Sequence, residues 1–229
     1  IDISMTPRPL GVQLTRGRFE GRIIGADAEE FPPIPSVEEG GGVTVDAQVL
    51  HHAINQVVFA AATEDSRPVL TGIKVDITGD DFTFAAADGF RLAVYKGKLA
   101  EAASEDVSFI VPSRSLQEVN RLIGSQQEPI EFTITPAKSQ ALFRLENIEV
   151  VTQLIQGTFP NYTQLIPQSY DTRVVVDLKE FQGATRTASI FARDGSNIIR
   201  LQVSPAEDGE SNGKLIISAR SEEVGDHED

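Results

Sequence analysis

Cysteine is absent from the 229-residue sequence, and this absence excludes several kinds of chemistry at once. Without cysteine there is no disulfide framework, no thiolate metal site and no cysteine nucleophile. This composition is compatible with a reducing compartment, and we expect a cytoplasmic protein. No apolar run approaches the roughly 20 residues that span a bilayer, and the opening segment IDISMTPRPLGVQL lacks the layout of a signal peptide. We therefore expect no membrane partner.

Positive charge is scarce. The chain has 20 Lys and Arg residues against 34 Asp and Glu residues, which gives a net charge of −14. By default this balance disfavours nonspecific binding to nucleic acid, although it does not exclude a local basic face. The 40% hydrophobic content supplies a core for one large or two ordinary domains. The chain begins at Ile1 rather than Met, so we expect it to be part of a longer chain.

Groups suited to catalysis are also few. His51 and His52 are adjacent on a predicted helix, so their side chains project about 100° apart and cannot easily share a metal ion. His227 lies in an acidic tail. No Ser–His–Asp arrangement or metal-ligand spacing is apparent. Three further acidic residues are better explained as turn formers: Asp80, Asp81 and Asp88. The sequence therefore predicts no enzyme, no metal and no cofactor.

The sequence contains an internal repeat. VTVDAQVLHHAINQVVFAA (43–61) is similar to VVVDLKEFQGATRTASIFA (174–192), and in both a short strand is followed by an Asp at the start of a helix. EGRIIGADAEEFPPIP (20–35) is similar to EVVTQLIQGTFPNYTQLIP (149–167), with Phe31 matched to Phe159. The two pairs of segments give nearly the same period, which predicts a repeated module of about 130 residues. Short strand–helix patterns can also recur by chance.

This period predicts three parts. Residues 1–41 form the end of one module, residues 42–168 a complete module and residues 169–229 the start of a third. The linkers are expected at EEGGG (38–42) and PQSYD (167–171), which are rich in glycine and polar residues.

Hydrophobic periodicity predicts the elements of the complete module. Asp46 is expected to cap a helix that runs to about Ala61, and Ser113 to cap a second helix. The residues expected to face inward are Leu50, Ala53, Ile54, Val57 and Ala61 on the first helix and Leu116, Val119, Leu122 and Ile123 on the second. Segments with strand patterns surround these helices in the order strand, helix, four strands, helix, three strands. Because nearly all connections suit antiparallel hairpins, including the one at Asp88-Gly89, we expect an α+β fold.

Cations lie on one face of the predicted helices. Arg114 and Arg121 are seven residues apart, as are Lys179 and Arg186, and Arg193 continues the second series. The apolar partners expected on the opposite side of the later helix are Leu178, Phe181, Ala188 and Phe191. Such a face can be an ordinary solvated surface or a surface that contacts phosphates.

Three motifs, in this order and spacing, carry a family resemblance. ADGFRLAVY (87–95), VPSRSLQEV (111–119) and GTFPNYTQLIP (157–167) together resemble the bacterial β sliding clamp family, the processivity subunit of DNA polymerase III. The resemblance implies a repeated DNA-clamp module with two helices packed on antiparallel sheets. It also implies a homodimeric ring of two chains that encircles duplex DNA and tethers the replicative polymerase. Much of the first and third domains of that family has no counterpart in this sequence.

The resemblance also implies two sites. A hydrophobic pocket would receive linear peptides from the DNA polymerase III catalytic subunit, the clamp loader and repair polymerases; its residues are Leu70, Gly89, Phe90, Arg91, Leu92, Pro160, Gln164 and Leu165. Residues expected to contact DNA phosphates are Arg67 and Arg114, with Gln164 nearby, and, from the helix faces, Arg121, Arg186 and Arg193. Two alternatives stay open. Leu70 and Leu92 can be plain core residues, and the chain can be a repeat-built peptide-binding scaffold unrelated to DNA.

Overall fold

The computed structural model describes residues 1–30, 42–135, 137–193, 197–206, 212–221 and 225–228. It shows three α-helices and several antiparallel sheets, which confirms the predicted α+β class. The chain separates into two compact units, 1–162 and 163–229. In the described ranges, no helix is both long and apolar enough to cross a membrane. Phe31, one of the residues that define the predicted period, lies outside these ranges.

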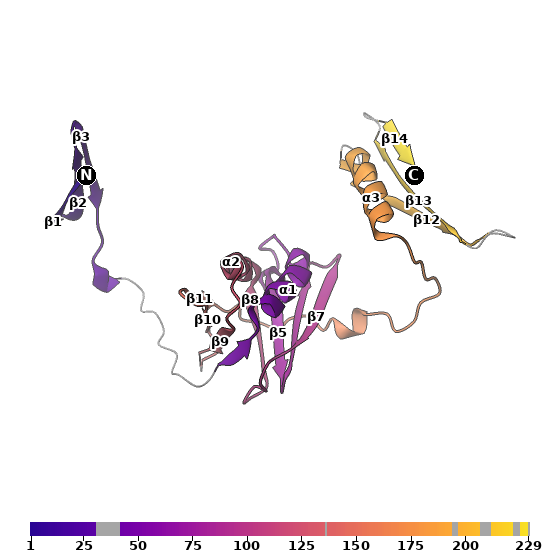
Figure 1. The fold of residues 1–229 in the computed structure, drawn as a ribbon, viewed down its shortest axis with the longest axis horizontal. Helices are drawn as coiled ribbons and strands as arrows, with labels where there is room; N and C mark the ends of the chain where they lie inside the picture. Colours follow the sequence, from indigo (N-terminus) through magenta and orange to yellow (C-terminus); the bar gives the residue numbers. More distant parts are fainter. Residues whose placement is uncertain (31–41, 136, 194–196, 207–211, 222–224, 229) are drawn as a thin grey trace. The chain divides into compact units, whose positions relative to one another are not determined.

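The first unit begins with a three-stranded meander, drawn in indigo in Figure 1. Its strands are β1 (Asp2–Pro7), β2 (Leu10–Arg16) and β3 (Phe19–Ile24), and a short 3₁₀ turn, η1 (Ala28–Glu30), follows. Adjacent strands pair antiparallel, with Ile3 opposite Leu14 and Leu14 opposite Gly21. Many apolar side chains of this meander are exposed, including Ile3, Met5 and Ile23. A sheet of this size is marginal without a partner surface.

Residues 42–162 form a module with two four-stranded sheets and two helices (Figure 1). One sheet has the order β7-β6-β5-β8, built from β5 (Gly72–Thr78), β6 (Asp81–Ala87), β7 (Leu92–Lys98) and β8 (Val107–Pro112). The other has the order β11-β10-β9-β4, built from β4 (Val43–Val45), β9 (Ile130–Ile134), β10 (Gln140–Arg144) and β11 (Glu149–Gln153). With α1 (Ala47–Val57) and α2 (Ser113–Ile123), this is the predicted order of elements.

Helix α1 begins where the sequence predicts. The Asp46 carboxylate accepts hydrogen bonds from the backbone N–H groups of Gln48 and Val49, both at 2.9 Å, and so satisfies donors that the helix itself cannot pair. The helix is shorter than predicted, because the chain tightens after Val57 into a 3₁₀ turn, η2 (Val58–Ala60). All five residues predicted to face inward are buried: Leu50, Ala53, Ile54, Val57 and Ala61.

Helix α2 corrects one prediction. Ser113 does not cap it: Pro112 holds the N-cap position, and no side chain there accepts a capping hydrogen bond. The reason is that β8 continues to Pro112, opposite Gly72 of β5, so that Ser113 is already the first helical residue and is buried. The predicted inward stripe is otherwise present, with Leu116, Val119 and Ile123 buried. Leu122 is half-buried against the same core.

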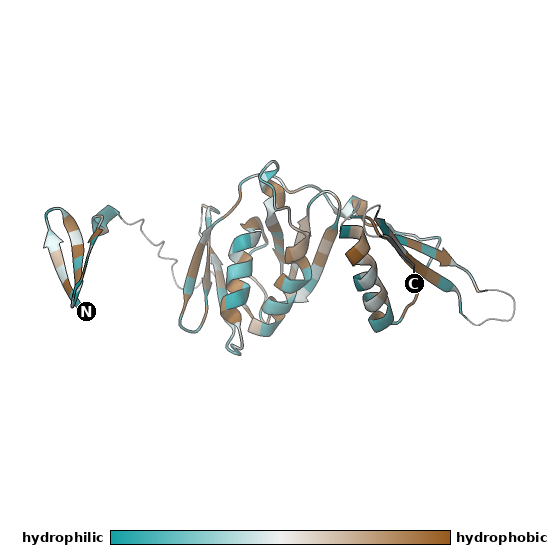
Figure 2. Cartoon of the chain, turned by 90° about the horizontal axis from the view of Figure 1, so that it is seen from above, coloured by the Kyte–Doolittle hydropathy of each residue, from teal (hydrophilic) through white to brown (hydrophobic). Residues whose placement is uncertain are grey.

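One large core joins the two sheets and both helices. It contains Ile54 from α1, Ile73 from β5, Leu116 from α2 and Ile130 from β9, each with 0% relative exposure. Figure 2 shows hydrophobic and hydrophilic residues alternating along the elements of this module, as expected for strands and helices with one buried face.

The second unit contains a short 3₁₀ turn, η4 (Thr163–Leu165), a helix, α3 (Leu178–Arg193), and a sheet of β12 (Arg200–Ser204), β13 (Lys214–Ser221) and β14 (Gly225–Glu228). Asp177 caps α3 by accepting hydrogen bonds from the N–H groups of Lys179 (2.8 Å) and Glu180 (3.0 Å). Asp177 therefore caps α3 in the same way that Asp46, at the matching position of the internal repeat, caps α1.

Two predictions for this unit are wrong. Val174–Val176 forms no strand, because within the described part of the unit the three strands pair only with one another and none pairs with this segment. Leu178 is 74% exposed rather than inward-facing. It is the first residue of the helix, about 80° around the axis from buried Ala188 and about 40° from buried Ala192. Phe181 and Phe191 are half-buried, as expected for that stripe.

Candidate functional site

A second, smaller hydrophobic cluster brings together residues from several motifs. It contains Leu70, Ala85, Ile110, Phe159 and Tyr162, all buried. Leu70 lies in the 3₁₀ turn η3 (Pro68–Thr71), and its carbonyl accepts a hydrogen bond from the Ala62 N–H at 2.9 Å. The loop after β11 is fixed to β8 by the bond from the Ile155 N–H to the Ile110 carbonyl, also 2.9 Å. These backbone bonds place the GTFPNY segment beside Leu70.

The two predicted pocket leucines differ in burial. Leu70 is only 6% exposed, so it is a core residue of this cluster. Leu92, the first residue of β7, is half-buried and packs against the same cluster. Pro160 is exposed next to buried Phe159. Leu92 is thus one of several half-buried residues that border the cluster, with Ala62, Val69, Ala87, Val94 and Ile155.

The turn from Asp88 to Arg91 is held by one carboxylate. Asp88 Oδ1 accepts hydrogen bonds from the N–H groups of Phe90 (2.9 Å) and Arg91 (3.0 Å), and Oδ2 accepts one from Arg91 Nε (2.9 Å). These donors, chiefly the two backbone groups, lower the pKa of Asp88 below its ordinary value. Gly89 has φ +95°, which L side chains rarely adopt. The result is a fixed turn that exposes 98% of the Phe90 side chain.

Arg67 lies against this turn. Its Nη2 donates a hydrogen bond to the Asp88 carbonyl at 3.1 Å, and a Cβ added to Gly89 would lie 3.1 Å from the same nitrogen. A residue that the resemblance assigns to DNA thus lies beside residues that it assigns to the peptide pocket. The DNA contact of Arg67 stays a prediction.

The sequence interpretation missed Phe59. This residue of η2 is 56% exposed, and the Arg91 guanidinium carbon lies 5.9 Å from the centre of its ring, close enough for a cation–π contact. Its signal in the sequence was its position between Val57 and Ala61, where a large aromatic residue does not belong to the inward stripe. The exposed ring of Phe59 therefore lies beside Arg91, which also follows exposed Phe90 in the sequence.

Gln164 and Leu165 belong to η4, in the second unit. Both are exposed, and Leu165 retains 70% of its surface. Their place in a pocket with the residues of the first unit stays a prediction.

The predicted DNA-contacting cations on the helices are all exposed: Arg114, Arg121, Arg186 and Arg193. They differ in their partners. Arg121 Nη2 pairs with Glu118 Oε1 at 2.5 Å, which lowers the pKa of that carboxyl and partly neutralises the arginine. Among the described residues, neither Arg114 nor Arg186 has an ion-pair partner. The contact of these cations with DNA phosphates stays a prediction.

No side-chain arrangement in the described part of the chain is suited to metal binding, since no group of three His, Asp or Glu residues comes together there. His52 packs edge-on against Tyr95, with ring centres 5.5 Å apart, as a packing residue does. The groups described above that are available to bind a partner are therefore the exposed turn at Asp88, the border of the hydrophobic cluster beside it and the exposed arginines of the helices.

Comparison with known proteins agrees with this geometry. Residues 44–161, about half of the chain, match the model of the DNA polymerase III beta subunit, central domain. The chain is 34% identical over 210 residues to the beta sliding clamp of Bacillus subtilis, covering 91% of this chain and 53% of that protein. It is 32% identical over 212 residues to the beta sliding clamp of Staphylococcus aureus, covering 93% and 54%.

A solved structure has the same fold. The crystal structure of the DNA polymerase sliding clamp from Bacillus subtilis superimposes with a TM-score of 0.85 at 32% identity, over 99% of this chain and 58% of that one. The chain thus spans about half the length of the curated relatives that it matches. A family model over half of the chain, relatives above 30% identity and a matching fold lead to one conclusion: the chain belongs to the β sliding clamp family of DNA polymerase III beta subunits.

Proposed function

We propose that the chain acts as part of a non-enzymatic sliding clamp, which in its complete ring encircles duplex DNA without reading its sequence and tethers a DNA polymerase. The family membership supports this proposal, as do the exposed cations of α2 and α3 in a chain of net charge −14. Contacts to phosphates would come from these helices, so that binding is electrostatic and independent of base sequence.

The peptide site of the proposed clamp is the surface around Leu92, Phe90 and Pro160, above the cluster of Leu70 and Phe159. The observation that carries this assignment is the fixed Asp88 turn, which exposes 98% of Phe90 beside an apolar cluster. A leucine or aromatic anchor of a partner peptide that is buried there would gain about 1.5–3 kcal/mol per side chain.

Peptide binding tests this site. In fluorescence anisotropy with a labelled Gln-Leu-x-Leu-Phe-type peptide, we expect saturable binding that Phe90→Ala weakens by about tenfold, since the lost ring contact is worth on the order of 1.4 kcal/mol. Ile148→Ala is the matched control, because Ile148 is a partly exposed apolar residue at the turn between β10 and β11. Equal binding by the parent and Phe90→Ala would remove Phe90 from the site. No binding by the parent would refute the site in this chain.

Salt dependence tests the DNA surface. We expect affinity for a labelled duplex to fall as salt rises, and Arg186→Ala and Arg114→Ala each to reduce the slope of log K against log salt by about 1. Arg121→Ala should change the slope less, because Glu118 already pairs with that arginine. Arg144→Ala serves as a control, since Glu131 (2.7 Å) and Glu149 (2.9 Å) both bind its guanidinium. Saturable peptide binding without salt-dependent DNA binding would favour the peptide scaffold unrelated to DNA.

A further inference from the structure

A pocket of about 160 Å³ lies between the two sheets of the complete module. One cross-strand pair from each sheet lines it: Ile77 with Val107 from β5 and β8, and Val43 with Phe132 from β4 and β9. All of its lining residues lie between positions 43 and 138. The pocket therefore belongs to the complete module, and it shares no residue with the proposed peptide and DNA sites.

The floor of this pocket is apolar and continues toward the core. Ile77 is only 3% exposed and Phe132 only 7%. Together with Val43, these two residues also line a smaller hollow of about 20 Å³, all of whose lining residues are apolar. A hollow with no polar group does not hold water well, so an apolar group is favoured there. The floor is thus suited to an aliphatic side chain.

One rim of the pocket is formed by Ser104 and Glu105, in the loop before β8. Both residues are exposed, but the backbone on either side of them is tied to Gly79. The Ala103 N–H donates a hydrogen bond to the Gly79 carbonyl at 2.9 Å, and Asp106 Oδ1 accepts one from the Gly79 N–H at 3.2 Å. The backbone that carries the Glu105 carboxylate is therefore fixed.

The other rim is formed by Thr135 and Lys138, in the hairpin between β9 and β10. The Lys138 N–H donates to the Thr135 carbonyl at 2.7 Å, and the Lys138 carbonyl accepts from Gln156 Nε2 at 3.1 Å. These bonds hold Lys138 at φ +50°, a left-handed conformation that L side chains rarely adopt. The backbone that carries this ammonium group is therefore fixed as well.

The two rims carry opposite charges that do not neutralise each other. Both Glu105 and Lys138 line the pocket, yet among the described residues neither takes part in an ion pair, with the other or with a third residue. A ligand with an anionic and a cationic group can therefore pair with both rims at once. The Ser104 hydroxyl adds a hydrogen-bond donor and acceptor beside Glu105.

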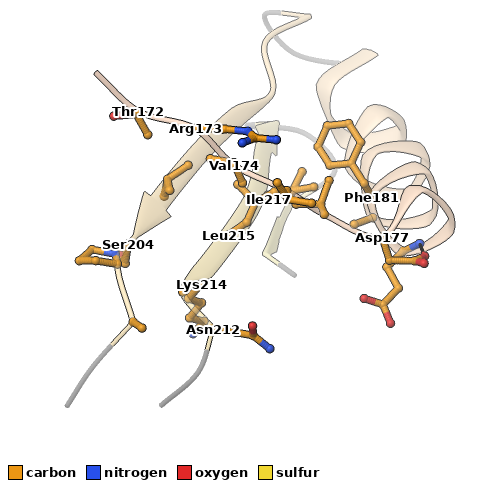
Figure 3. A pocket seen from close by; sticks show the side chains of 18 of the residues that line it. Thr172, Arg173, Val174, Asp177, Phe181, Ser204, Asn212, Lys214, Leu215 and Ile217 are labelled. Atoms are coloured by element: carbon orange, nitrogen blue, oxygen red, sulfur yellow. Dashed lines mark hydrogen bonds between the residues drawn. The ribbon is translucent and has the colours of Figure 1, made fainter. Parts of the chain in front are cut away.

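A larger hollow in the second unit, of about 1210 Å³, is built differently. Figure 3 shows it between residues 172–174 and the strand that carries Leu215 and Ile217. Residues 171–177 of its wall belong to no helix or strand. Of these two hollows, the one in the complete module is therefore the one whose walls are paired strands and hydrogen-bonded loops.

From these observations we propose that the pocket of the complete module binds an α-amino acid with an aliphatic side chain of about the size of leucine. In such a molecule the carboxylate, the ammonium group and the side chain branch from one carbon atom. The pocket offers a partner for each: Lys138 for the carboxylate, Glu105 for the ammonium group, and the floor of Ile77 and Phe132 for the side chain. Drug-sized ligands occupy pockets of about 300–1,000 Å³, so this pocket suits a smaller molecule.

A bound amino acid would connect the two sheets of the module. Glu105 precedes β8 of one sheet, and Lys138 lies between β9 and β10 of the other. A ligand that binds only the folded module also stabilises it against unfolding. This inference does not depend on the proposed peptide or DNA sites.

Titration of this chain with L-leucine, followed in amide NMR spectra, tests the pocket. We expect saturable shifts at Ser104, Glu105 and Lys138. Three analogues each lack one group: glycine lacks the side chain, isocaproate the ammonium group, and leucinamide the carboxylate. Glycine should bind at least about tenfold more weakly than leucine, because it leaves the floor empty. Isocaproate and leucinamide should each bind about fivefold more weakly, since each loses one exposed ion pair.

Two charge variants assign the rims. Lys138→Met should weaken leucine binding about fivefold but should not weaken leucinamide, which has no carboxylate to lose a partner. Glu105→Gln should weaken leucine by a similar factor but should not weaken isocaproate, which has no ammonium group. Lys96→Met and Glu146→Gln are the matched controls, because both residues are exposed and lie outside the pocket lining. Both controls should bind leucine as the parent chain does.

All four substitutions change exposed side chains, so circular dichroism should show unchanged secondary structure. Absence of saturable leucine binding by the parent chain would overturn the proposal. So would glycine binding as tight as that of leucine, because the apolar floor would then contribute nothing. Losses of leucine binding that are as large in the control variants as in Lys138→Met and Glu105→Gln would show that the rims are not the binding groups.

Discussion

Replacing Leu116 by Ala is expected to lower the free energy of unfolding of the complete module by about 2–5 kcal/mol, since this is the range for large-to-small changes at fully buried positions. Leu116 has 0% relative exposure and lies on α2, in the core that joins both sheets to both helices. The module cannot easily close the resulting cavity, because this core is built from several elements whose residues, such as Ile54 and Ile130, are themselves fully buried.

Urea unfolding followed by circular dichroism measures this effect. Leu165→Ala is the matched control: that leucine is 70% exposed, so its loss should change stability by less than about 0.5 kcal/mol. A loss below about 1 kcal/mol for Leu116→Ala would mean that α2 does not pack into the core as described.

Replacing Gly89 by Ala is expected to damage both the turn and the peptide site. At φ +95° a side chain is strained by about 1–3 kcal/mol, and the new Cβ would meet Arg67 Nη2 at 3.1 Å. The turn should therefore shift, carrying Phe90 and Arg91 away from the cluster, and peptide affinity should fall by about tenfold or more.

Gly183→Ala is the contrasting variant. Gly183 lies inside α3, and no heavy atom lies within 4 Å of the position that an added Cβ would take. Alanine there should therefore stabilise its unit by about 0.5–1 kcal/mol and leave peptide affinity unchanged. If Gly89→Ala keeps full peptide affinity and stability, the turn is not the rigid element of the site.

The Asp88 carboxylate gives this turn a defined pH response. Because hydrogen bonds lower its pKa in the folded chain, the carboxylate supports the turn above its unfolded-state pKa. That support is lost as the pH falls through the lowered folded-state value. At neutral pH the turn is therefore fully held by this carboxylate.

Local signals in the sequence determined much of this protein. The spacing of Leu50, Ile54 and Val57 was sufficient to place the buried face of α1, because a helix repeats every 3.6 residues whatever surrounds it. The caps at Asp46 and Asp177 were equally predictable, since a capping carboxylate needs only the two backbone N–H groups that follow it. The motifs around Gly89 and Pro160 were sufficient to suggest the family.

Tertiary structure decided the features that depend on partners distant in the sequence. Val174–Val176 has strand-like residues but forms no strand, because a strand needs a neighbour to pair with its backbone. Leu178 has the side chain of a core residue but is 74% exposed, whereas Ala47, at the matching first position of α1, is fully buried. The contact of Arg67 with Asp88 and that of Arg91 with Phe59 join segments separated by loops, so no local pattern could specify them. The sequence by itself determined the order of elements in the complete module and the family, whereas only the tertiary structure decided which strand-like segments pair and which apolar residues are covered.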